Sequence, residues 1–417
     1  MRETLDLLRS EPRGRIFFLA LAQSSLGTGA GYIALLLIAE SRFSSPWAIS
    51  LVLIADLVPA MLLGPLFGAV ADRWSRKSCM IVADLLRAFA FAGIVVFDSF
   101  EATVALAMLA GAGTGLFTPA ALASLPSVVD SPRRVPAATS LYGAVGDLGF
   151  TIGPAFAAVV LVFGGNETLL WVNVATFALS GAILVPLRFG AVPAHPPDTP
   201  RPSLLAETRD GLRATAGMPA VRLVLLASSA ALFCAGLLNI AELFLATDVI
   251  GTSQAGFGVL VAFFGLGFIA GSLSGAKGGS PPTLKRRYLI GVAVLGAGLV
   301  AIGLTGNLYV GFATFALGGF GNGQLLVYER LLIQAACPDE LFGRVFGIKD
   351  ALTAWAFAIA FLVGGAAVST AGPAAVITAA GALCLVIAWV VALALRGHWG
   401  PTPDSGEAAR DAGAVSA

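Results

Sequence analysis

Three acidic side chains fall inside long apolar stretches of this sequence: Asp56, Asp147 and Glu242. An ionisable group inside a lipid bilayer costs a few kcal/mol, so acids placed there are rare and usually serve a function. A low dielectric favours the protonated carboxyl, which makes all three candidates for carrying protons. Asn239 stands one turn before Glu242, so this acid is also a candidate for binding a cation or lining a cavity. The alternative is that a buried partner neutralises each acid and that its role is packing.

The chain as a whole is too apolar for a water-soluble protein. Of its 417 residues, 57% are hydrophobic and 12% are charged, against about 25% charged residues in typical soluble domains. The mean hydropathy is +0.88. We therefore expect an integral membrane protein, and the net charge of +1 gives no reason to expect a nucleic-acid partner.

Long uninterrupted apolar runs predict membrane-spanning helices, because about 20 helical residues cross the hydrocarbon core. A transmembrane barrel would need short strands of alternating character instead. The sequence predicts twelve spans, at residues 16–39, 47–70, 79–97, 102–124, 136–163, 167–187, 221–247, 255–276, 287–305, 308–334, 342–368 and 372–395.

The basic residues predict how these spans are oriented. With the N-terminus in the cytoplasm, every Lys and Arg except Arg42 falls on the cytoplasmic side, as the positive-inside rule requires. A proline-rich break divides the spans six and six. The prediction is an N-terminal bundle over 1–187, a cytoplasmic linker over 188–220, a C-terminal bundle over 221–396 and a disordered cytoplasmic tail over 397–417.

Two similar glycine-rich stretches lie 208 residues apart: LAGAGTG from Leu109 and LGGFGNG from Leu317. Each belongs to a span that ends in a charged turn. This pattern indicates two six-helix repeats of the same orientation, an architecture in which transporters bind substrate near the midplane between the repeats. No strand is predicted before either stretch, which argues against a nucleotide-binding loop.

The second span ends in a compact cluster of both signs of charge, in the stretch LFGAVADRWSRK from Leu66 to Lys77. Positive-inside topology explains the bases but leaves Asp72 unexplained. We interpret the cluster as a cytoplasmic gate that holds the two halves together and opens during transport, with its bases paired to acids such as Asp84 or Asp130. Charged residues at other inner span ends are assigned to the same gate, which gives the set Gly68, Asp72, Arg73, Arg76, Lys77, Asp84, Arg87, Asp130, Glu329, Arg330, Lys349 and Asp350.

At this stretch the sequence resembles the major facilitator superfamily. GAVADRWSRK is similar to the signature between the second and third spans of that superfamily, with Ser75 where a glycine is usual. GDLGFTIGPAF in span five is similar to its antiporter signature, carried here by Gly149, Gly153 and Pro154. The resemblance implies a fold of twelve transmembrane helices in two pseudo-symmetric bundles, with access that alternates between the two sides of the membrane.

Three further stretches resemble the bacterial branch that exports drugs and siderophores, of the enterobactin and macrolide efflux type. They are ADLLRA at 83–88, ETRDGLRATAGMPAVRLVLL at 207–226 and PDELFGRVFG at 338–347. This branch implies export driven by proton entry. Many proton-coupled drug antiporters carry an arginine in the middle of span four, and residues 102–124 contain none. Coupling is therefore expected to rest on other groups.

The fold implied by the resemblance lines its central cavity with spans one, four, seven and ten. The side chains there are mostly apolar and aromatic with scattered hydrogen-bonding groups, which suits a hydrophobic or amphipathic organic substrate, cationic ones included, better than a sugar or a phosphate. The predicted lining residues are Gln23, Ser24, Thr28, Tyr32, Thr114, Phe117, Thr118, Phe233, Asn239, Phe315, Asn322, Gln324 and Tyr328.

Other kinds of chemistry find no support in the sequence. The four cysteines are far apart, both histidines lie in polar segments, and there is no Walker motif, nucleophile–base pair or cofactor loop. We expect no enzyme activity, no metal and no cofactor, with the proton gradient as energy source. The prediction is a monomeric exporter of a drug, siderophore or secondary metabolite, surrounded by lipid in the bacterial inner membrane, with both termini cytoplasmic. The alternatives are a facilitator or importer of a small nutrient, and a lipid flippase.

Overall fold

A computed structural model describes residues 7–189, 212–213, 215–338, 341–396 and 398 of the chain. Within these ranges the chain is almost entirely helical and has no strand, so the predicted all-α membrane fold is confirmed. The predicted linker and the predicted tail fall mostly outside the described residues. The long helices are α2 (Pro12–Phe43), α3 (Pro46–Arg73), α4 (Arg76–Val96), α5 (Phe100–Val128), α6 (Val135–Leu184), α8 (Pro219–Phe244), α9 (Gln254–Leu273), α10 (Pro281–Gly303), α11 (Leu308–Ala336), α12 (Phe342–Ala371) and α13 (Pro373–Ala394).

Three short helical turns complete the described elements: η1 (Pro132–Arg134), η2 (Leu245–Val249) and η3 (Ser274–Lys277). Five of the long helices begin at a proline. Proline suits the first helical position because the missing N–H would have no partner there, and its fixed φ is already helical.

Within the described ranges eleven helices are long and apolar enough to cross a membrane, and the longest of them carries two spans. As a single helix, the 50 residues of α6 would measure about 75 Å, far more than the hydrocarbon core of about 30 Å. At Gly165 the backbone leaves the helical region, with φ 70° and ψ −168°, a conformation that favours glycine. The break separates the predicted spans 136–163 and 167–187, so the prediction of twelve spans is confirmed.

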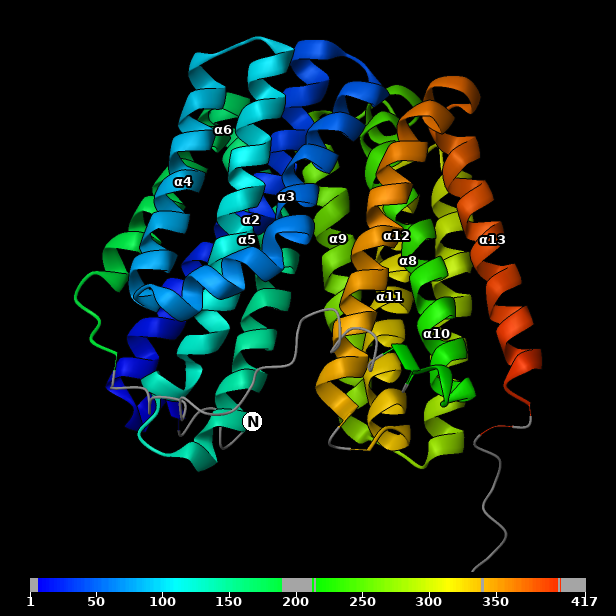
Figure 1. Ribbon diagram of the computed structural model, residues 1–417. Coiled ribbons are helices and arrows are strands. Elements are labelled where there is room, and N and C mark those ends of the chain that lie inside the picture. The colour runs from blue at the N-terminus through cyan, green and yellow to red at the C-terminus, as the bar shows by residue number, and fades with distance from the viewer. Residues whose placement is uncertain (1–6, 190–211, 214, 339–340, 397, 399–417) are drawn as a thin grey trace, which may run out of the picture.

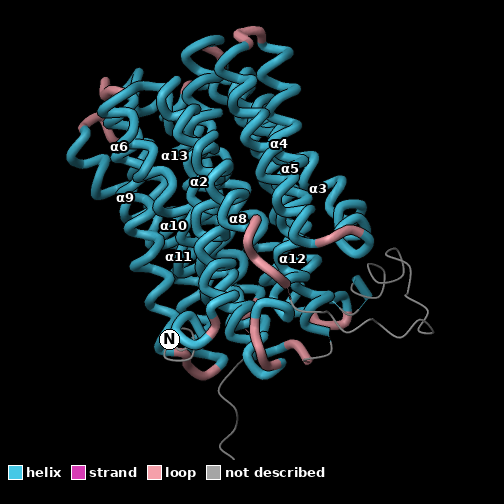
Figure 2. The backbone as a smooth tube through the Cα atoms, turned by 90° about the vertical axis from the view of Figure 1, so that its left-hand side faces the viewer, coloured by secondary structure: helices cyan, strands magenta, loops and turns pink. Residues whose placement is uncertain are grey.

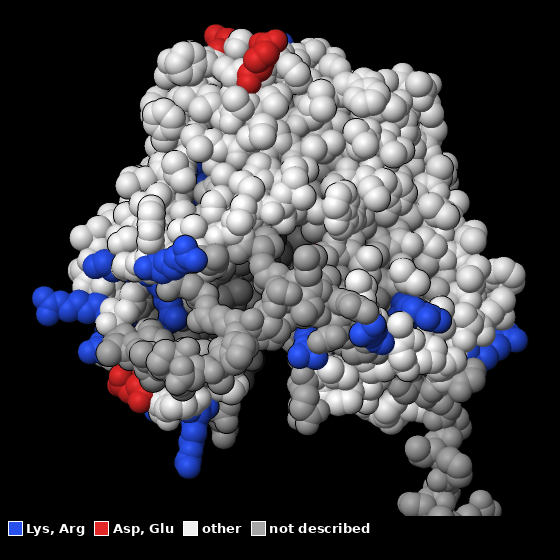
Figure 3. All heavy atoms as spheres, in the orientation of Figure 1, with Lys and Arg blue, Asp and Glu red and all other residues white. Residues whose placement is uncertain are grey.

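The helices form two bundles that stand side by side (Figures 1 and 2). α2 to α6 pack against one another in the first bundle, and α8 to α13 do so in the second. α2 begins and α13 ends at the same end of the molecule, the lower end in Figure 1. Lys and Arg side chains gather toward this end, whereas the upper end shows acidic side chains (Figure 3). We call these two ends the basic face and the opposite face.

Glycine contacts show that the two bundles are built alike. A Cβ atom on Gly111 would collide with the backbone of Asp56 in α3, and one on Gly319 would collide with the backbone of Phe264 in α9. The same shift of 208 residues relates both members of the two pairs. The next glycine along each stretch contacts α4 and α10 at the same shift. The two glycine-rich stretches therefore hold α5 and α11 against corresponding neighbours, because small residues permit close helix approach.

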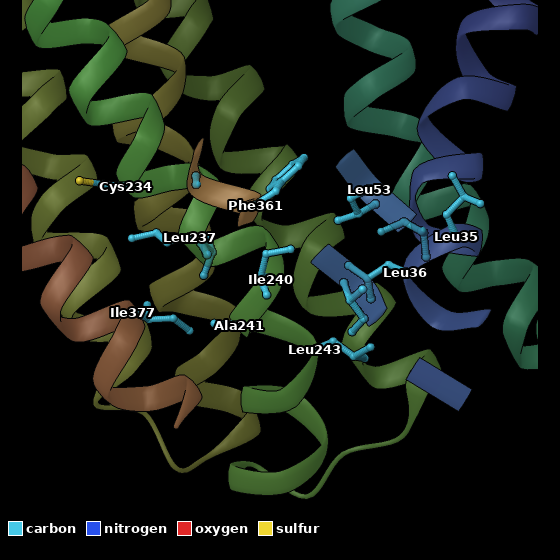
Figure 4. Packing of buried hydrophobic residues seen from close by; sticks show 14 of the residues in the cluster. Leu35, Leu36, Leu53, Cys234, Leu237, Ile240, Ala241, Leu243, Phe361 and Ile377 are labelled. Carbon is cyan, nitrogen blue, oxygen red and sulfur yellow. The ribbon is translucent and has the colours of Figure 1, made fainter. Parts of the chain in front are cut away.

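The two bundles meet in the half of the molecule nearer the opposite face. The Tyr32 hydroxyl of α2 lies 3.5 Å from the Asn239 carbonyl oxygen of α8, and α6 and α3 contact α9 and α12. Buried apolar residues of both bundles form one continuous core, which includes Leu36 of α2 and Leu243 of α8 (Figure 4). Toward the basic face the surface is hollowed between the bundles (Figure 3). The arrangement is closed at the opposite face and open toward the basic face.

We expect Gly111→Ala to destabilise the protein, because the added Cβ would enter the space of the Asp56 carbonyl oxygen. Overpacking of this kind typically costs about 1–3 kcal/mol. Gly146→Ala is the matched control, since a Cβ at that position meets no atom within 4 Å. Thermal unfolding in detergent, followed by intrinsic fluorescence, compares the two variants. Equal melting temperatures would contradict a tight contact at Gly111.

Candidate functional site

A cavity of about 400 Å³ lies between the two bundles. The first bundle contributes residues of α2, α3 and α6, and the second bundle contributes residues of α8, α9, α11 and α12. The lining residues are Gly29, Tyr32, Leu53, Asp56, Leu57 and Pro154 from the first bundle, and Ala235, Leu238, Asn239, Glu242, Val261, Phe264, Gly265, Phe268, Asn322, Leu326, Phe357 and Phe361 from the second.

The cavity combines an apolar, largely aromatic wall with two carboxyl groups. Asp56 enters it from the first bundle and Glu242 from the second. None of the lining residues is Lys, Arg or His. Pockets with apolar walls and a few convergent polar groups bind organic molecules, and aromatic faces also attract cations. The lining therefore suits a molecule that joins an apolar body to a positive charge.

Glu242 is a buried acid without a counter-ion. Its residue is only 3% exposed, and no described residue forms an ion pair with it. Tyr32, across the cavity on α2, lies near enough for the two side chains to interact electrostatically. Asn239 stands one turn earlier on α8 and faces the same cavity. Because a buried carboxylate needs a partner, this carboxyl is available to a proton or to a cationic group of a substrate.

Asp56 lies on α3, half-buried at the cavity wall. Its backbone is packed against Gly111 of α5, which fixes the depth of the side chain in the bundle. Behind it, Arg87 of α4 lies near enough for the two charges to interact. The two cavity acids therefore differ: Asp56 has a cation in its surroundings, and Glu242 has none.

Arg87 and Asp84 form a buried ion pair inside the first bundle. Arg87 Nη2 lies 2.5 Å from Asp84 Oδ1 and donates to Ser24 Oγ of α2 at 2.9 Å. The guanidinium also stacks on the rings of Phe117 and Phe177, whose centroids are 4.7 and 4.3 Å away. Both charged residues are at most 2% exposed.

The location of this ion pair differs from the one predicted from the sequence. Asp84 and Arg87 were expected in the cytoplasmic gate, yet they pair with each other among helices of one bundle, away from the boundary between the bundles. Their spacing of three residues places both on one face of α4, which explains why they satisfy each other.

The two basic side chains at the start of α4 bond to backbone carbonyls of the first bundle. Arg76 donates to the Ala123 carbonyl oxygen, and Lys77 Nζ donates to the Val185 carbonyl oxygen at 2.7 Å. The expected pairing of these bases with Asp84 or Asp130 is not found among the described side chains. Val185 follows the end of α6, where free carbonyls favour a cation.

The remaining gate residues predicted in the first bundle are Gly68, Asp72, Arg73 and Asp130. Arg73 and Asp130 are exposed, and a Cβ on Gly68 would meet no atom within 4 Å. The side chain of Asp72 lies outside the part of the chain that the structure describes. The role of this cluster as a latch therefore stays a prediction.

An ion pair that the sequence did not predict joins the start of the chain to the first bundle. Arg134 Nη1 lies 2.5 Å from Glu11 Oε1, and the Asp130 backbone N–H donates to the same oxygen at 3.3 Å. Glu11 is 2% exposed. This pair fastens the segment before α2 to the turn between α5 and α6. Its 123-residue separation explains why sequence spacing gave no sign of it.

The charged residues predicted for the gate in the second bundle occupy two environments. Lys349 Nζ bonds to Asp350 Oδ1 at 3.3 Å near the start of α12, and Arg330 lies over the Phe346 ring. Glu329 is completely buried in α11, and neither of its carboxyl oxygens has a hydrogen-bond partner among the described residues. The expected Glu329–Arg330 pairing is therefore absent from this part of the chain.

The residues of the antiporter signature hold α6 against α2. Cβ atoms on Gly149 and Gly153 would collide with the α2 residues Ser25 and Gly29, so these glycines permit a backbone contact. Pro154 follows them and lines the cavity. The side chain of Asp147, the third predicted proton carrier, lies outside the described part of the structure.

Of the predicted lining residues, Tyr32, Asn239 and Asn322 line the cavity. Most of the others pack elsewhere: Ser24, Thr28 and Phe117 surround Arg87, Gln324 and Tyr328 bond to Ser274, and Phe315 is fully buried in the second bundle. Gln23, Thr114, Thr118 and Phe233 also lie outside the lining set. The wall is instead completed by Phe264, Phe268, Phe357 and Phe361 from α9 and α12. Within each helix the two phenylalanines are four residues apart, so the sequence shows that they share a helix face. Predicting that this face meets the cavity would have required the rotation of the helix.

No group of three or more His, Cys, Asp or Glu residues within the described ranges is arranged to hold a metal ion. The site residues above are acids, amides and aromatic rings. Side chains of these types can accept protons and can contact positively charged organic groups.

Comparison with known sequences gives matches over most of the chain. Residues 16–284 match the family Major Facilitator Superfamily. The chain is 25% identical over 372 residues to the uncharacterized MFS-type transporter YfiS of Bacillus subtilis (strain 168), covering 87% of this chain and 88% of that protein. It is 26% identical over 416 residues to the multidrug efflux pump Tap of Mycobacterium tuberculosis (strain ATCC 25618 / H37Rv), covering 93% and 95% of the two chains.

Solved structures share the fold. A bacterial homolog to the human lysosomal transporter Spinster, in an inward-facing and unoccupied conformation, superposes with a TM-score of 0.72 at 14% identity and covers 94% of this chain and 99% of that one. The nucleoside transporter NupG superposes with a TM-score of 0.71 at 12% identity and covers 92% and 99% of the two chains.

We expect Arg87→Leu to destabilise the protein by about 3–5 kcal/mol, because it leaves Asp84 buried without its partner. Adding Asp84→Val should restore most of the loss. The positions related by the 208-residue shift are Leu295 and Val292, so the double variant copies an apolar pair that the second bundle already packs. Chemical unfolding in detergent tests this. If the single and double variants are equally unstable, the pair does not act as a unit.

Proposed function

Because the chain belongs to the Major Facilitator Superfamily, we propose that it exports amphipathic organic cations from the cell in exchange for protons. The family and the relatives are transporters, so the chain is a membrane transporter and not an enzyme. The observation that carries the proposed substrate class is the central cavity, with its aromatic wall, two acids and no basic residue in its lining.

The proposed exchange follows from the chemistry of a carboxyl group in low dielectric. A carboxylate there is stable only with a positive partner, which is either a proton or the cationic group of a substrate. The two ligands therefore compete for Asp56 and Glu242. Proton binding from one side releases the cation, and cation binding from the other side releases the proton.

The proposed direction rests on the topology and on a relative. Lys and Arg gather at the face toward which the bundles open, and the positive-inside rule assigns such a face to the cytoplasm. The cavity would then load from the cytoplasm or from the inner leaflet of a bacterial cell membrane. Export agrees with the similarity to Tap, a multidrug efflux pump, which aligns over nearly its whole length.

The cycle alternates access by movement of the bundles relative to each other. In the arrangement seen here, Tyr32 and Asn239 close the cavity toward the opposite face. At the same face, Gln254 Nε2 of α9 lies 3.4 Å from Glu40 Oε2 of α2. Release of the substrate would require both contacts to separate while the basic face closes.

We expect Glu242→Gln to abolish export of a cationic dye such as ethidium and to leave protein folding unchanged, because the amide keeps the shape but cannot pair with the cation. The measurement is dye efflux from a pump-deficient bacterial host, together with dye uptake into inside-out vesicles energised by a pH gradient. Glu101→Gln is the matched control, since Glu101 is exposed at the opposite face. Full dye efflux by Glu242→Gln would contradict the assigned role.

The same vesicles test proton coupling. Uphill dye transport should stop when the pH gradient is collapsed, and Asp56→Asn should show the same loss in the presence of the gradient. Transport at an unchanged rate without the gradient would instead indicate a facilitator. Movement of labelled lipid between leaflets, with no dye transport, would indicate a flippase.

A further inference from the structure

Glu329 is the most enclosed acid among the described residues of the second bundle. It lies on α11, it is 0% exposed, and both carboxyl oxygens lack a hydrogen-bond partner among the described residues. The position in α5 related by the 208-residue shift is Ala121, which is also fully buried. An alanine thus fills this place in the first bundle, so packing alone does not call for an acid.

The surroundings of Glu329 offer two cations, one acid and two hydroxyl groups. Ser228 of α8 and Tyr288 of α10 lie beside it, and their hydroxyl oxygens are 2.9 Å apart. Lys349 of α12 lies near enough to interact with Glu329 electrostatically but bonds to Asp350 instead. The other charged neighbours are Asp350 itself and Arg330.

An apolar cluster separates Glu329 from the basic face. Ile333 lies one turn beyond Glu329 on α11, and Leu225 lies one turn from Ser228 on α8, both on the side of the basic face. They pack with Val221, Cys337 and Val345 in a cluster that is 7% exposed at most. A proton reaches Glu329 from this side only when α8, α11 and α12 move apart.

We propose that Glu329 is a proton-binding site inside the second bundle, separate from the acids of the central cavity, and that its proton determines the partner of Lys349. With the proton in place, Glu329 is neutral and Lys349 pairs with Asp350, as the structure shows. When the proton leaves, the bare carboxylate attracts Lys349 away from Asp350, because a buried charge without a partner is strongly unfavourable.

The exchange of partners would change the charge at the boundary between the bundles. Asp350 lines a small pocket with Met61 and Leu62 of α3 and Trp355 of α12. When Lys349 moves away, the carboxylate of Asp350 remains at this boundary without Lys349 as its counter-ion. The proton on Glu329 is thereby linked to the contact between α3 and α12. This inference rests on the proposed function only in taking protons as the driving ion, and it makes no use of the cargo.

Infrared difference spectroscopy of the protein in lipid, recorded while the pH is raised, tests the site directly. A protonated carboxylic acid has its own C=O stretching band, and we expect the wild type to lose one component of this band when Glu329 is deprotonated. Glu329→Gln should lack this component, Glu329→Asp should shift it, and the exposed control Glu101→Gln should retain it. Glu242→Gln should also retain it, which separates this site from the central cavity.

Lys349→Gln tests the exchange of partners. Without the cation, the Glu329 component should persist to higher pH, by about one to three pH units, the effect of one nearby opposite charge. Lys349→Arg should titrate like the wild type. An unchanged spectrum in Glu329→Gln would overturn the site, and an unchanged titration in Lys349→Gln would overturn the exchange.

The amide in Glu329→Gln imitates the protonated acid, so failure of this variant to fold would also contradict a neutral Glu329. Dye transport lost in Glu242→Gln, with the Glu329 component intact, would support both sites independently. A present Glu329 component without any dye transport by the wild type would overturn the proposed cargo and leave the proton site standing.

Discussion

The cost of placing a charge in hydrocarbon determines how this protein is built. Each buried acid must be paired, protonated or bound to a cation, and the structure shows the first of these solutions directly. Asp84 is paired with Arg87 and accepts a hydrogen bond from Ser24, so its charge is neutralised inside the first bundle. Among the described residues Glu242 and Glu329 have no such ion pair, and this difference separates a paired buried acid from two unpaired ones.

The internal repeat makes this difference visible. Glycines at corresponding positions hold α5 and α11 against the same neighbours, so the two bundles share one packing scheme. The side chains that the two bundles carry at corresponding positions differ in polarity and charge. Where the first bundle has Asp56, the second has Phe264, and together they give the cavity an acid on one wall and an aromatic ring on another. Divergence of the two halves thus produces a binding chamber with both apolar and charged walls.

The sequence predicted the fold well because its signals are local. Apolar runs, basic loops and the spaced glycines each depend on residues close together in the chain, and the break at Gly165 is a single glycine between two runs. The site was predicted only in part, because it depends on helix rotation and on contacts across bundles. Asp56 and Glu242 were predicted from residue type and depth. Tyr32, Asn239 and Asn322 were predicted from the spans that the family resemblance assigns to the cavity, whereas Phe357 and Phe361 of α12 required knowledge of which faces meet. The burial of Glu329 was likewise hidden, since a neighbouring Arg330 suggested an exposed ion pair.

Under the proposed exchange, the two carboxyls of the cavity would also set the charge balance of each turnover. A cargo with one positive charge that displaces one proton moves no net charge, so the membrane potential does no work on the cycle. A cargo that displaces both protons carries one net charge inward, and a potential of 100 mV then adds about 2.3 kcal/mol, enough for roughly fiftyfold further accumulation. The number of protons that Asp56 and Glu242 exchange would thus decide whether voltage, as well as the pH difference, limits how steep a concentration gradient this transporter can build.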